Sequence, residues 1–396
     1  MKITRILIVI SVSFHILFIT GCFGNKNNPQ ISTSNVTPSP SPTPSPVTSV
    51  QTPVYTPVNN GYGPNGTSIV STGTPVAIST ATEGANIYYT LDGTSPSTAN
   101  GTLYTFPVSI NRTTTLKAIA VKSGLNTSTI SSTTYTVYVS PYNIAPVFTA
   151  TKLGNDFTQR DALPVSNIQT DQWYDQSSSY YAKNPGRLTW GPTLIQYPAV
   201  TNPTLDQQSI RWKKQRIVYV AQRYINTQYQ HHYLIQWNPP QTWPMDTANP
   251  VVLGHQSQGI DCSDFTSWNY SYGMGIKMNS DVSEQAALTE VEDAYEGRIK
   301  IEKYYKKKTF LETVSQFEIG DLLYIAPQEG ETVTHVITWI GQVNGAGEYL
   351  VIDSHDQFNI TDSNNQVVPT GVQIRPFKEN QWYFQGFTNA NRIFHP

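Results

Sequence analysis

Cysteine is almost absent from this chain, whose 396 residues contain only Cys22 and Cys262. A disulfide-stapled scaffold needs several cysteine pairs, so the fold does not depend on a disulfide framework. Charge is sparse as well: charged residues make up 13% of the chain, and the net charge is −2. No basic stripe indicates a nucleic-acid partner, and no acidic tail indicates a basic one. The length predicts two to three domains.

Apolar runs long enough to span a membrane are also missing. The most extended apolar stretch, within residues 6–19, is short for a spanning helix and follows the basic residues Lys2 and Arg5. It leads into the sequence Ile-Thr-Gly-Cys, which matches the lipobox of bacterial lipoprotein signals. We therefore expect residues 1–22 to be a lipoprotein signal peptide and lipidated Cys22 to anchor the protein to a membrane. Phe23, in place of aspartate, favours the outer membrane, on its periplasmic or cell-surface face, for this exported lipoprotein.

Residues 23–62 are rich in proline, serine and threonine, with alternating prolines at 38–46. Such a sequence favours an extended polyproline conformation and cannot bury a core, so it predicts a disordered linker. Residues 141–205 show little periodicity and predict an irregular lead-in to the last domain.

Between these segments, residues 63–140 contain short β-branched and aromatic runs separated by turns. This pattern predicts a small all-β sandwich, with strands at 87–91, 114–121 and 132–138. The sequence Tyr-Tyr-Thr-Leu-Asp-Gly-Thr-Ser-Pro, which begins at Tyr88, resembles the chitobiase C-terminal-type module, a fibronectin-like accessory domain. The resemblance implies either glycan contact or a spacer; we favour the spacer, because the module has no catalytic constellation of its own.

Residues 206–396 are expected to form one α+β unit. Apolar residues at helical spacing precede a loop, and Cys262 then begins a second amphipathic run, so its thiol is expected at a helix start. The helix dipole and free N–H groups there would favour the reactive thiolate. The expected helices are 209–226, the segment from Cys262, and 281–306; the expected strands are 320–325, 334–341 and 349–355.

Four motifs of this unit resemble those of NlpC-type cell-wall peptidases. They are a tyrosine after the first helix, Asp-Cys-Ser at a helix start, Gly-Asp-Leu, and His-Val-x-x-x-Ile-Gly on a strand; here they are Tyr229, 261–263, 320–322 and 335–341. Any one motif is weak, but four in this order are specific. The resemblance implies a papain-like cysteine hydrolase with helices packed on an antiparallel sheet.

By that resemblance Cys262 is the nucleophile and His335 the base. The third group, which orients the base, is either Asp353 or His355, two residues that share one sheet face. We favour His355, because Cys-His-His is the commonest set in the family, and Asp353 remains the alternative.

The resemblance also assigns the substrate contacts. Tyr229, Asp261 and Ser263 would hold the free amine of the substrate or stabilise the acyl intermediate, and His231 is a further candidate for the cleft. Asp264 departs from the family, which usually has glycine there, and adds a charge near the thiol.

The implied substrates are peptidoglycan stem peptides, cut between γ-D-glutamate and a diamino acid. No cofactor is expected, and no metal, because the histidine spacings match no zinc signature. Two alternatives remain: an amidase or acyltransferase of the same fold, and a non-enzymatic lipoprotein that binds glycan through the β module.

Overall fold

The computed structural model describes residues 48–142, 174–175, 193–194, 208–230, 259–274, 276–279, 281–293 and 297–396. The predicted signal peptide with Cys22, most of the predicted linker, and His231 lie outside these residues. Within the expected lead-in, the structure describes a short antiparallel pair, β9 (Tyr174–Asp175) and β10 (Thr193–Leu194). Among the described residues, no helix combines the length and apolar character that crossing a bilayer requires.

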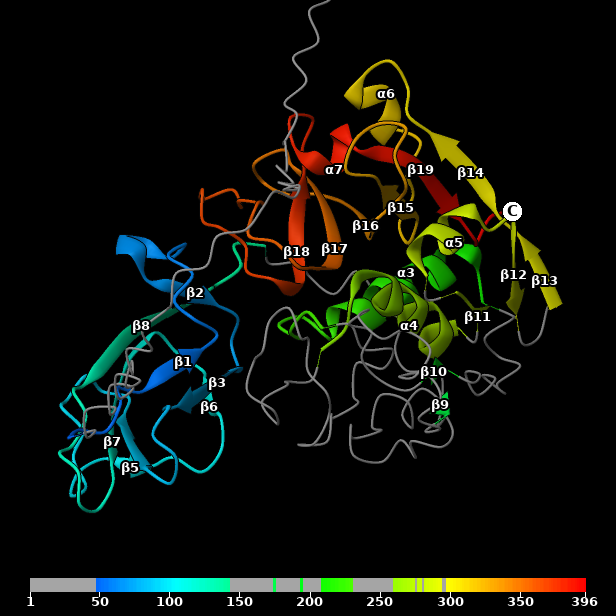
Figure 1. Cartoon of the computed structure of the whole chain (residues 1–396). Helices are drawn as coiled ribbons and strands as arrows, with labels where there is room; N and C mark the ends of the chain where they lie inside the picture. Colours follow the sequence, from blue (N-terminus) through cyan, green and yellow to red (C-terminus); the bar gives the residue numbers. More distant parts are fainter. Residues whose placement is uncertain are drawn as a thin grey trace, which may run out of the picture. The chain divides into compact units, whose positions relative to one another are not determined.

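Two β-sheets form the N-terminal module (Figure 1). Its elements are β1 (Val54–Thr56), the 3-10 turn η1 (Pro64–Gly66), β2 (Ser68–Val70), β3 (Thr74–Ser79), β4 (Asn86–Thr90), β5 (Thr102–Leu103), β6 (Val108–Ile110), β7 (Thr114–Val121) and β8 (Ser131–Val137). The sheet orders are β1-β3-β6 and β2-β8-β7-β4-β5. Ile78, Leu116 and Tyr135 come from both sheets and share one buried core. The three expected strands are confirmed as β4, β7 and β8.

This module begins earlier than the expected boundary at residue 63. Strand β1 pairs antiparallel with β3. Val50 and Tyr55 are only 3% and 9% exposed, and both belong to the module's core. The linker prediction was therefore wrong for residues 50–62: the alternating prolines end at 46, and the apolar side chains that follow are enough to join a sheet.

The C-terminal unit is built on a six-stranded antiparallel sheet. Its strands are β14 (Glu302–Tyr305), β15 (Leu322–Ile325), β16 (His335–Val343), β17 (Tyr349–His355), β18 (Gly371–Phe377) and β19 (Phe387–Arg392). They are ordered β14-β19-β15-β16-β17-β18, so β14 and β18 form the edges (Figure 1). Alternate residues of β17 enter different cores, with Ile352 in one cluster and Val351 in another. The sheet is thus covered on both faces.

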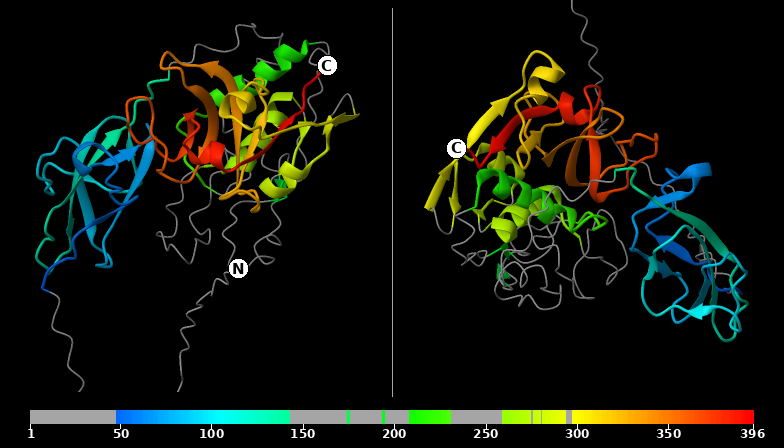
Figure 2. Two further views of the ribbon diagram at one scale, coloured as in Figure 1. Left: turned by 90° about the horizontal axis from the view of Figure 1, so that it is seen from above. Right: turned by 180° about the vertical axis from the view of Figure 1, so that it is seen from behind.

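Two helices cover one face of this sheet. They are α3 (Ile210–Gln222) and α4 (Cys262–Met274), which pack on each other and on β16 and β17 (Figure 2). Ser209 caps α3 by accepting the N–H of Trp212 at 3.2 Å. The remaining helices, α5 (Val282–Ala287), α6 (Phe310–Val314) and α7 (Trp382–Gln385), are short. The described fold therefore has several sheets and few helices, and the papain-like helical arrangement stays a prediction.

The expected long helix over 281–306 is wrong. Only α5 is helical there, and it is followed by β12 (Glu290–Asp293), β13 (Gly297–Lys300) and β14. Strands β12 and β13 pair antiparallel and extend a small sheet that begins with β11 (Ile276–Lys277). Apolar Val291 and Ile299 alternate with polar neighbours, which suits strands, and Gly297 adopts a positive φ of 78° that a helix cannot use.

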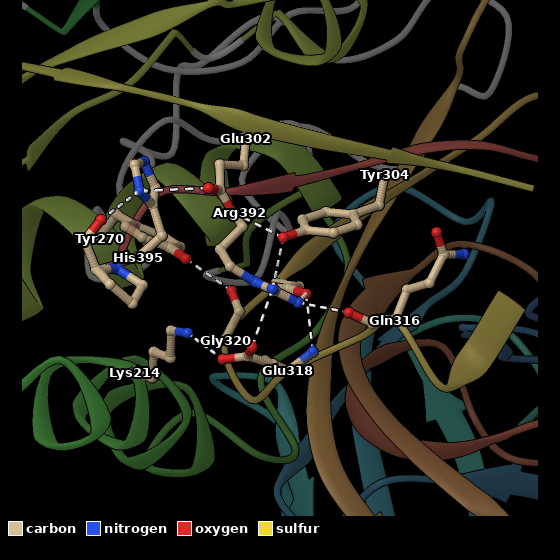
Figure 3. Close-up of polar contacts among 11 residues, drawn as sticks. Lys214, Tyr270, Glu302, Tyr304, Gln316, Glu318, Gly320, Arg392 and His395 are labelled. Carbon is tan, nitrogen blue, oxygen red and sulfur yellow. Dashed lines mark hydrogen bonds and ion pairs between the residues drawn. The ribbon is translucent and has the colours of Figure 1, made fainter.

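The Gly-Asp-Leu motif contributes contacts between separate elements of this unit (Figure 3). Arg392 on β19 donates to the buried Asp321 carboxylate from Nε at 3.0 Å and from Nη2 at 2.7 Å. The guanidinium also donates to the carbonyl of Gln316 at 2.6 Å. Gly320 has a φ of 87°, and a Cβ there would lie 3.2 Å from the carbonyl oxygen of Lys214. The motif therefore joins β15, β19 and α3.

Replacing Arg392 with methionine is expected to lower the free energy of unfolding by about 3–5 kcal/mol, because the buried Asp321 charge loses its partner. The matched control is Arg298→Met. Arg298 pairs with Glu290, but their side chains are 77% and 43% exposed, so we expect a loss within about 1 kcal/mol. Urea unfolding followed by tryptophan fluorescence measures both. Equal losses of unfolding free energy in the two variants would contradict a stabilising role for the Arg392–Asp321 pair.

Candidate active site

Cys262 is the first residue of α4, and the residues around it form the cap of that helix. The Asp261 carboxylate accepts the N–H of Asp264 at 2.8 Å and the hydroxyl of Ser263 at 3.2 Å. Cys262 is 5% exposed and belongs to the same buried cluster as Val336 on β16. The sequence prediction of a cysteine at a helix start, with Asp261 and Ser263 beside it, is confirmed.

The helix start was predicted to favour a thiolate, but the burial of Cys262 acts against that form. Burial, and next to it the Asp261 charge, raise the pKa of the Cys262 thiol well above its ordinary value. The backbone N–H of Val336 acts in the opposite direction but does not outweigh them. These surroundings favour the neutral thiol at this position.

The surroundings of Asp264 oppose the charge that its residue type suggests. Its side chain is 3% exposed, and burial followed by the Asp261 charge raises the pKa of the Asp264 carboxyl well above its usual range. The two carboxyl groups also share a hydrogen bond that favours the protonated form of Asp264. These surroundings favour the protonated form of the Asp264 carboxyl.

His335 and Asp353 lie on the neighbouring strands β16 and β17. Nε2 of His335 is 2.6 Å from Oδ2 of Asp353, and both residues are buried. Nδ1 of His355 is 4.0 Å from the same oxygen, and its ring meets that of His335 edge-on at a centroid distance of 4.9 Å. The structure pairs His335 with Asp353, so our preference for His355 as its hydrogen-bonding partner was wrong.

The Asp353 carboxylate stays charged although it is 0% exposed. Burial alone would raise its pKa, but the Arg375 charge and the hydrogen bond with His335 hold the pKa of Asp353 below its usual range. A permanently ionised acceptor at Nε2 fixes the ring so that Nδ1 of His335 carries the lone pair that can take a proton.

His355 is held as a neutral imidazole. Its Nε2 lies 2.8 Å from Oδ1 of Asn359, which can only accept, so this nitrogen carries the hydrogen. Burial, followed by the charges of His335 and Arg375, lowers the pKa of His355 to about 3. His355 therefore packs against His335 as a neutral ring.

This shift predicts acid destabilisation that depends on His355. Because the pKa is lower in the folded state than its unfolded value of about 6.5, the unfolded chain binds the proton first as the pH falls. The stability that neutral His355 contributes is present above about pH 6.5 and declines towards pH 3, by at most about 1.4 kcal/mol per pH unit. We expect His355→Gln, which keeps a donor, to flatten this decline in urea unfolding between pH 4 and 7.5. Parallel curves for the two proteins would contradict it.

His335, Asp353 and His355 also resemble a metal site, because one ligand atom from each lies within 4.8 Å of the others. The contacts of Asp353 argue against that use. Its Oδ1 accepts from Arg375 and its Oδ2 accepts from Tyr383 as well as facing His335. A guanidinium in contact with the carboxylate repels a cation, so the residues fit a hydrogen-bonded relay better than a metal centre.

A cleft of about 340 Å³ opens beside His335. Its lining residues are Tyr229, Pro327, Thr334, His335, Asp356, Gln357, Asn359 and Trp382. Tyr229 thus lies where the sequence predicted a substrate contact. Burial and then the nearby Cys262, Asp261 and Asp356 groups raise the pKa of its hydroxyl, so Tyr229 is a neutral donor.

Sequence reasoning missed several residues of this region. Asp356 and Trp382 line the cleft, and Arg375 and Tyr383 contact Asp353. One signal was available: Gln373 and Arg375 interrupt the apolar pattern of β18 at alternate positions, which marks a polar sheet face. Which acid that face would meet depends on the register, because Arg375 lies opposite Val351 and reaches Asp353 diagonally.

A cysteine at a helix start and a histidine–aspartate pair beside a cleft are the groups that thiol hydrolases use. Residues 249–383 are an NlpC/P60 family domain, and residues 76–135 are an Fn3-associated module. The NlpC-type recognition made from the sequence is confirmed. For the β module an Fn3-associated module is shown, and the chitobiase C-terminal type stays a prediction. The NlpC/P60 family suggests a cell-wall hydrolase, and its members are typically cysteine peptidases.

The chain is also similar to a solved NlpC/P60 family protein from Bacillus cereus. The identity is 22%, the match covers 35% of this chain and 32% of that protein, and the TM-score is 0.23. The match thus spans about a third of that protein's length. No curated protein matches the chain.

Proposed function

We propose that the C-terminal unit is a cysteine endopeptidase that hydrolyses peptidoglycan stem peptides. The observation that carries the proposal is the 2.6 Å contact of His335 with ionised Asp353 beside the cleft, within the domain whose helix start presents Cys262. A buried imidazole oriented by a carboxylate serves as a general base for a thiol that is neutral at rest.

In the proposed reaction, Sγ of Cys262 forms a bond to the peptide carbonyl carbon as its proton moves to Nδ1 of His335. Backbone N–H groups at the start of α4 stabilise the oxyanion. The C–N bond then breaks as His335 returns the proton to the leaving amine. Water, deprotonated by His335, attacks the thioester; the acid leaves, and the thiol regains its proton. Asp353 stabilises the His335 imidazolium in both steps, the formation of the thioester and its hydrolysis.

The substrate contacts are part of the same proposal. Tyr229 lines the cleft, and the Asp261 carboxylate and Ser263 lie beside Cys262 at the helix start. Acidic groups near Tyr229, including Asp356, favour a cationic group such as the free amine of a stem peptide.

We also propose that the enzyme is an exported lipoprotein of the outer membrane, anchored through Cys22. The support is the signal sequence at 1–22 and the proline-rich linker that follows it. The β module would serve as a spacer or contact glycan.

The test is mass spectrometry of purified cell wall digested with the protein. A peptidase releases peptides with a new amine on the diamino acid and a new carboxyl on γ-D-glutamate. Cleavage between the sugar and the first stem residue would replace the proposal with an amidase, and transfer to an added amine would replace it with an acyltransferase. Binding without any new ends would leave only the glycan-binding alternative.

A further inference from the structure

Side chains on β18 and α7 hydrogen-bond the Asp353 carboxylate. Arg375 on β18 donates from Nη1 to Oδ1 of Asp353 and, at 3.3 Å, to its backbone oxygen. Tyr383 on α7 donates its hydroxyl to Oδ2. Arg375, Tyr383 and Asp353 are all 0% exposed. We propose that Arg375 and Tyr383 are positioning residues, which hold the Asp353 carboxylate charged and aimed at His335.

Arg375 is itself fixed by backbone on its far side. Its Nη2 donates to the carbonyls of Pro369 at 2.6 Å and Gly371 at 3.1 Å. Gly371 has a φ of 87°, and a Cβ there would lie 2.2 Å from the carbonyl oxygen of Thr227, so only glycine fits beside this backbone. The planar guanidinium spans these acceptors and Asp353 at once and cannot be deprotonated, which a flexible ammonium does not reproduce.

Tyr383 contacts both members of the pair. Its hydroxyl meets Asp353, while its ring lies parallel to that of His335, at a centroid distance of 5.8 Å and an angle of 5°. Phe377 packs beside it, with a centroid distance of 6.5 Å. The phenol therefore sets the direction of the carboxylate and the plane of the imidazole together.

This inference rests on the proposed function, in which His335 becomes an imidazolium when it takes the thiol proton. A buried carboxylate without compensating donors would rotate or take up a proton. Either change would remove the acceptor at Nε2 of His335 and make the ion pair of thiolate and imidazolium less stable. Neither Arg375 nor Tyr383 lines the cleft, so their effect must pass through Asp353 and His335.

The decisive variant is Tyr383→Phe, which keeps the ring on His335 and removes only the hydroxyl. Iodoacetamide alkylation of Cys262, followed from pH 4 to 9, reports thiolate formation without any substrate. We expect the variant to react about tenfold more slowly at neutral pH, with its profile displaced to higher pH, because a hydrogen bond to a charged group is lost. In stem-peptide cleavage, kcat should fall about tenfold while KM is unchanged.

Two further variants separate positioning from folding. Arg375→Lys keeps a positive charge but loses the planar guanidinium with its several donors. The rate of Cys262 alkylation in this variant should lie between those of the wild type and Arg375→Met. Tyr270→Phe is the matched control, since Tyr270 is equally buried and donates its hydroxyl to the Gly320 carbonyl at 2.6 Å. It should lower the unfolding midpoint without displacing the pH profile.

The outcomes distinguish this inference from the proposed function. A slower, displaced alkylation profile in Tyr383→Phe supports the positioning role even if the wild type cleaves no stem peptide, in which case only the proposed substrate fails. If the wild type cleaves and Tyr383→Phe matches it in rate and profile, the positioning role is overturned. It is also overturned if Tyr383→Phe and Tyr270→Phe slow alkylation equally with no displacement, or if wild-type Cys262 does not react.

Discussion

Replacing Cys262 with alanine is expected to reduce stem-peptide cleavage by about 10⁵- to 10⁶-fold, because no other group can form the acyl intermediate. Cys262 is the only thiol among the described residues, and it starts the helix that meets β16. Release of new amine ends from purified wall, measured against time and enzyme concentration, gives the rate.

The matched control for this substitution is Ser271→Ala, which changes another buried residue of α4 and leaves the helix start intact. It should retain nearly the full rate. Wild-type rates in both variants would mean that the new ends arise without the thiol, and the cysteine mechanism would have to be abandoned.

Asparagine at position 353 is expected to lower kcat/KM by about 10⁴-fold. The amide can offer a donor to Nε2 of His335, which would turn the ring to the tautomer that has no lone pair for the thiol proton. His355→Gln should cost less than about tenfold, because His355 lies 4.0 Å from the carboxylate and hydrogen-bonds Asn359 instead. Steady-state kinetics on a defined stem tripeptide compares the two.

Asp353→Asn also leaves Arg375 without its charged partner, so its unfolding midpoint is measured alongside and activity is assayed well below it. A larger loss in His355→Gln than in Asp353→Asn would reverse the assignment and make His355 the group that orients the base.

Much of the local structure followed from sequence pattern. Strands β7, β15, β16 and β17 lie where β-branched and apolar runs predicted them. Strand β15 is buried along its whole length, and a strand buried on both faces needs a continuous apolar run. The prediction of a long helix over 281–306 failed because sequence pattern is ambiguous there. The charged residues of this segment suit an exposed helix as well as strands at the edge of the unit. Pairing of β14 with β19, which is distant in sequence, and of β12 with β11 decided between the two states.

Cys262, Asp261 and His335 were identifiable from the sequence because each belongs to a short motif whose spacing sets its local geometry. The partner of His335 was not. Asp353 and His355 share a strand face, so pattern alone leaves both within reach. The strand register decides whether Asp353 or His355 hydrogen-bonds Nε2 of His335. The contacts that Arg375 from β18 and Tyr383 from α7 make with Asp353 decide it as well. The charge states of Cys262 and Asp264 likewise depend on burial, a property of the packed tertiary structure rather than of the residues beside them.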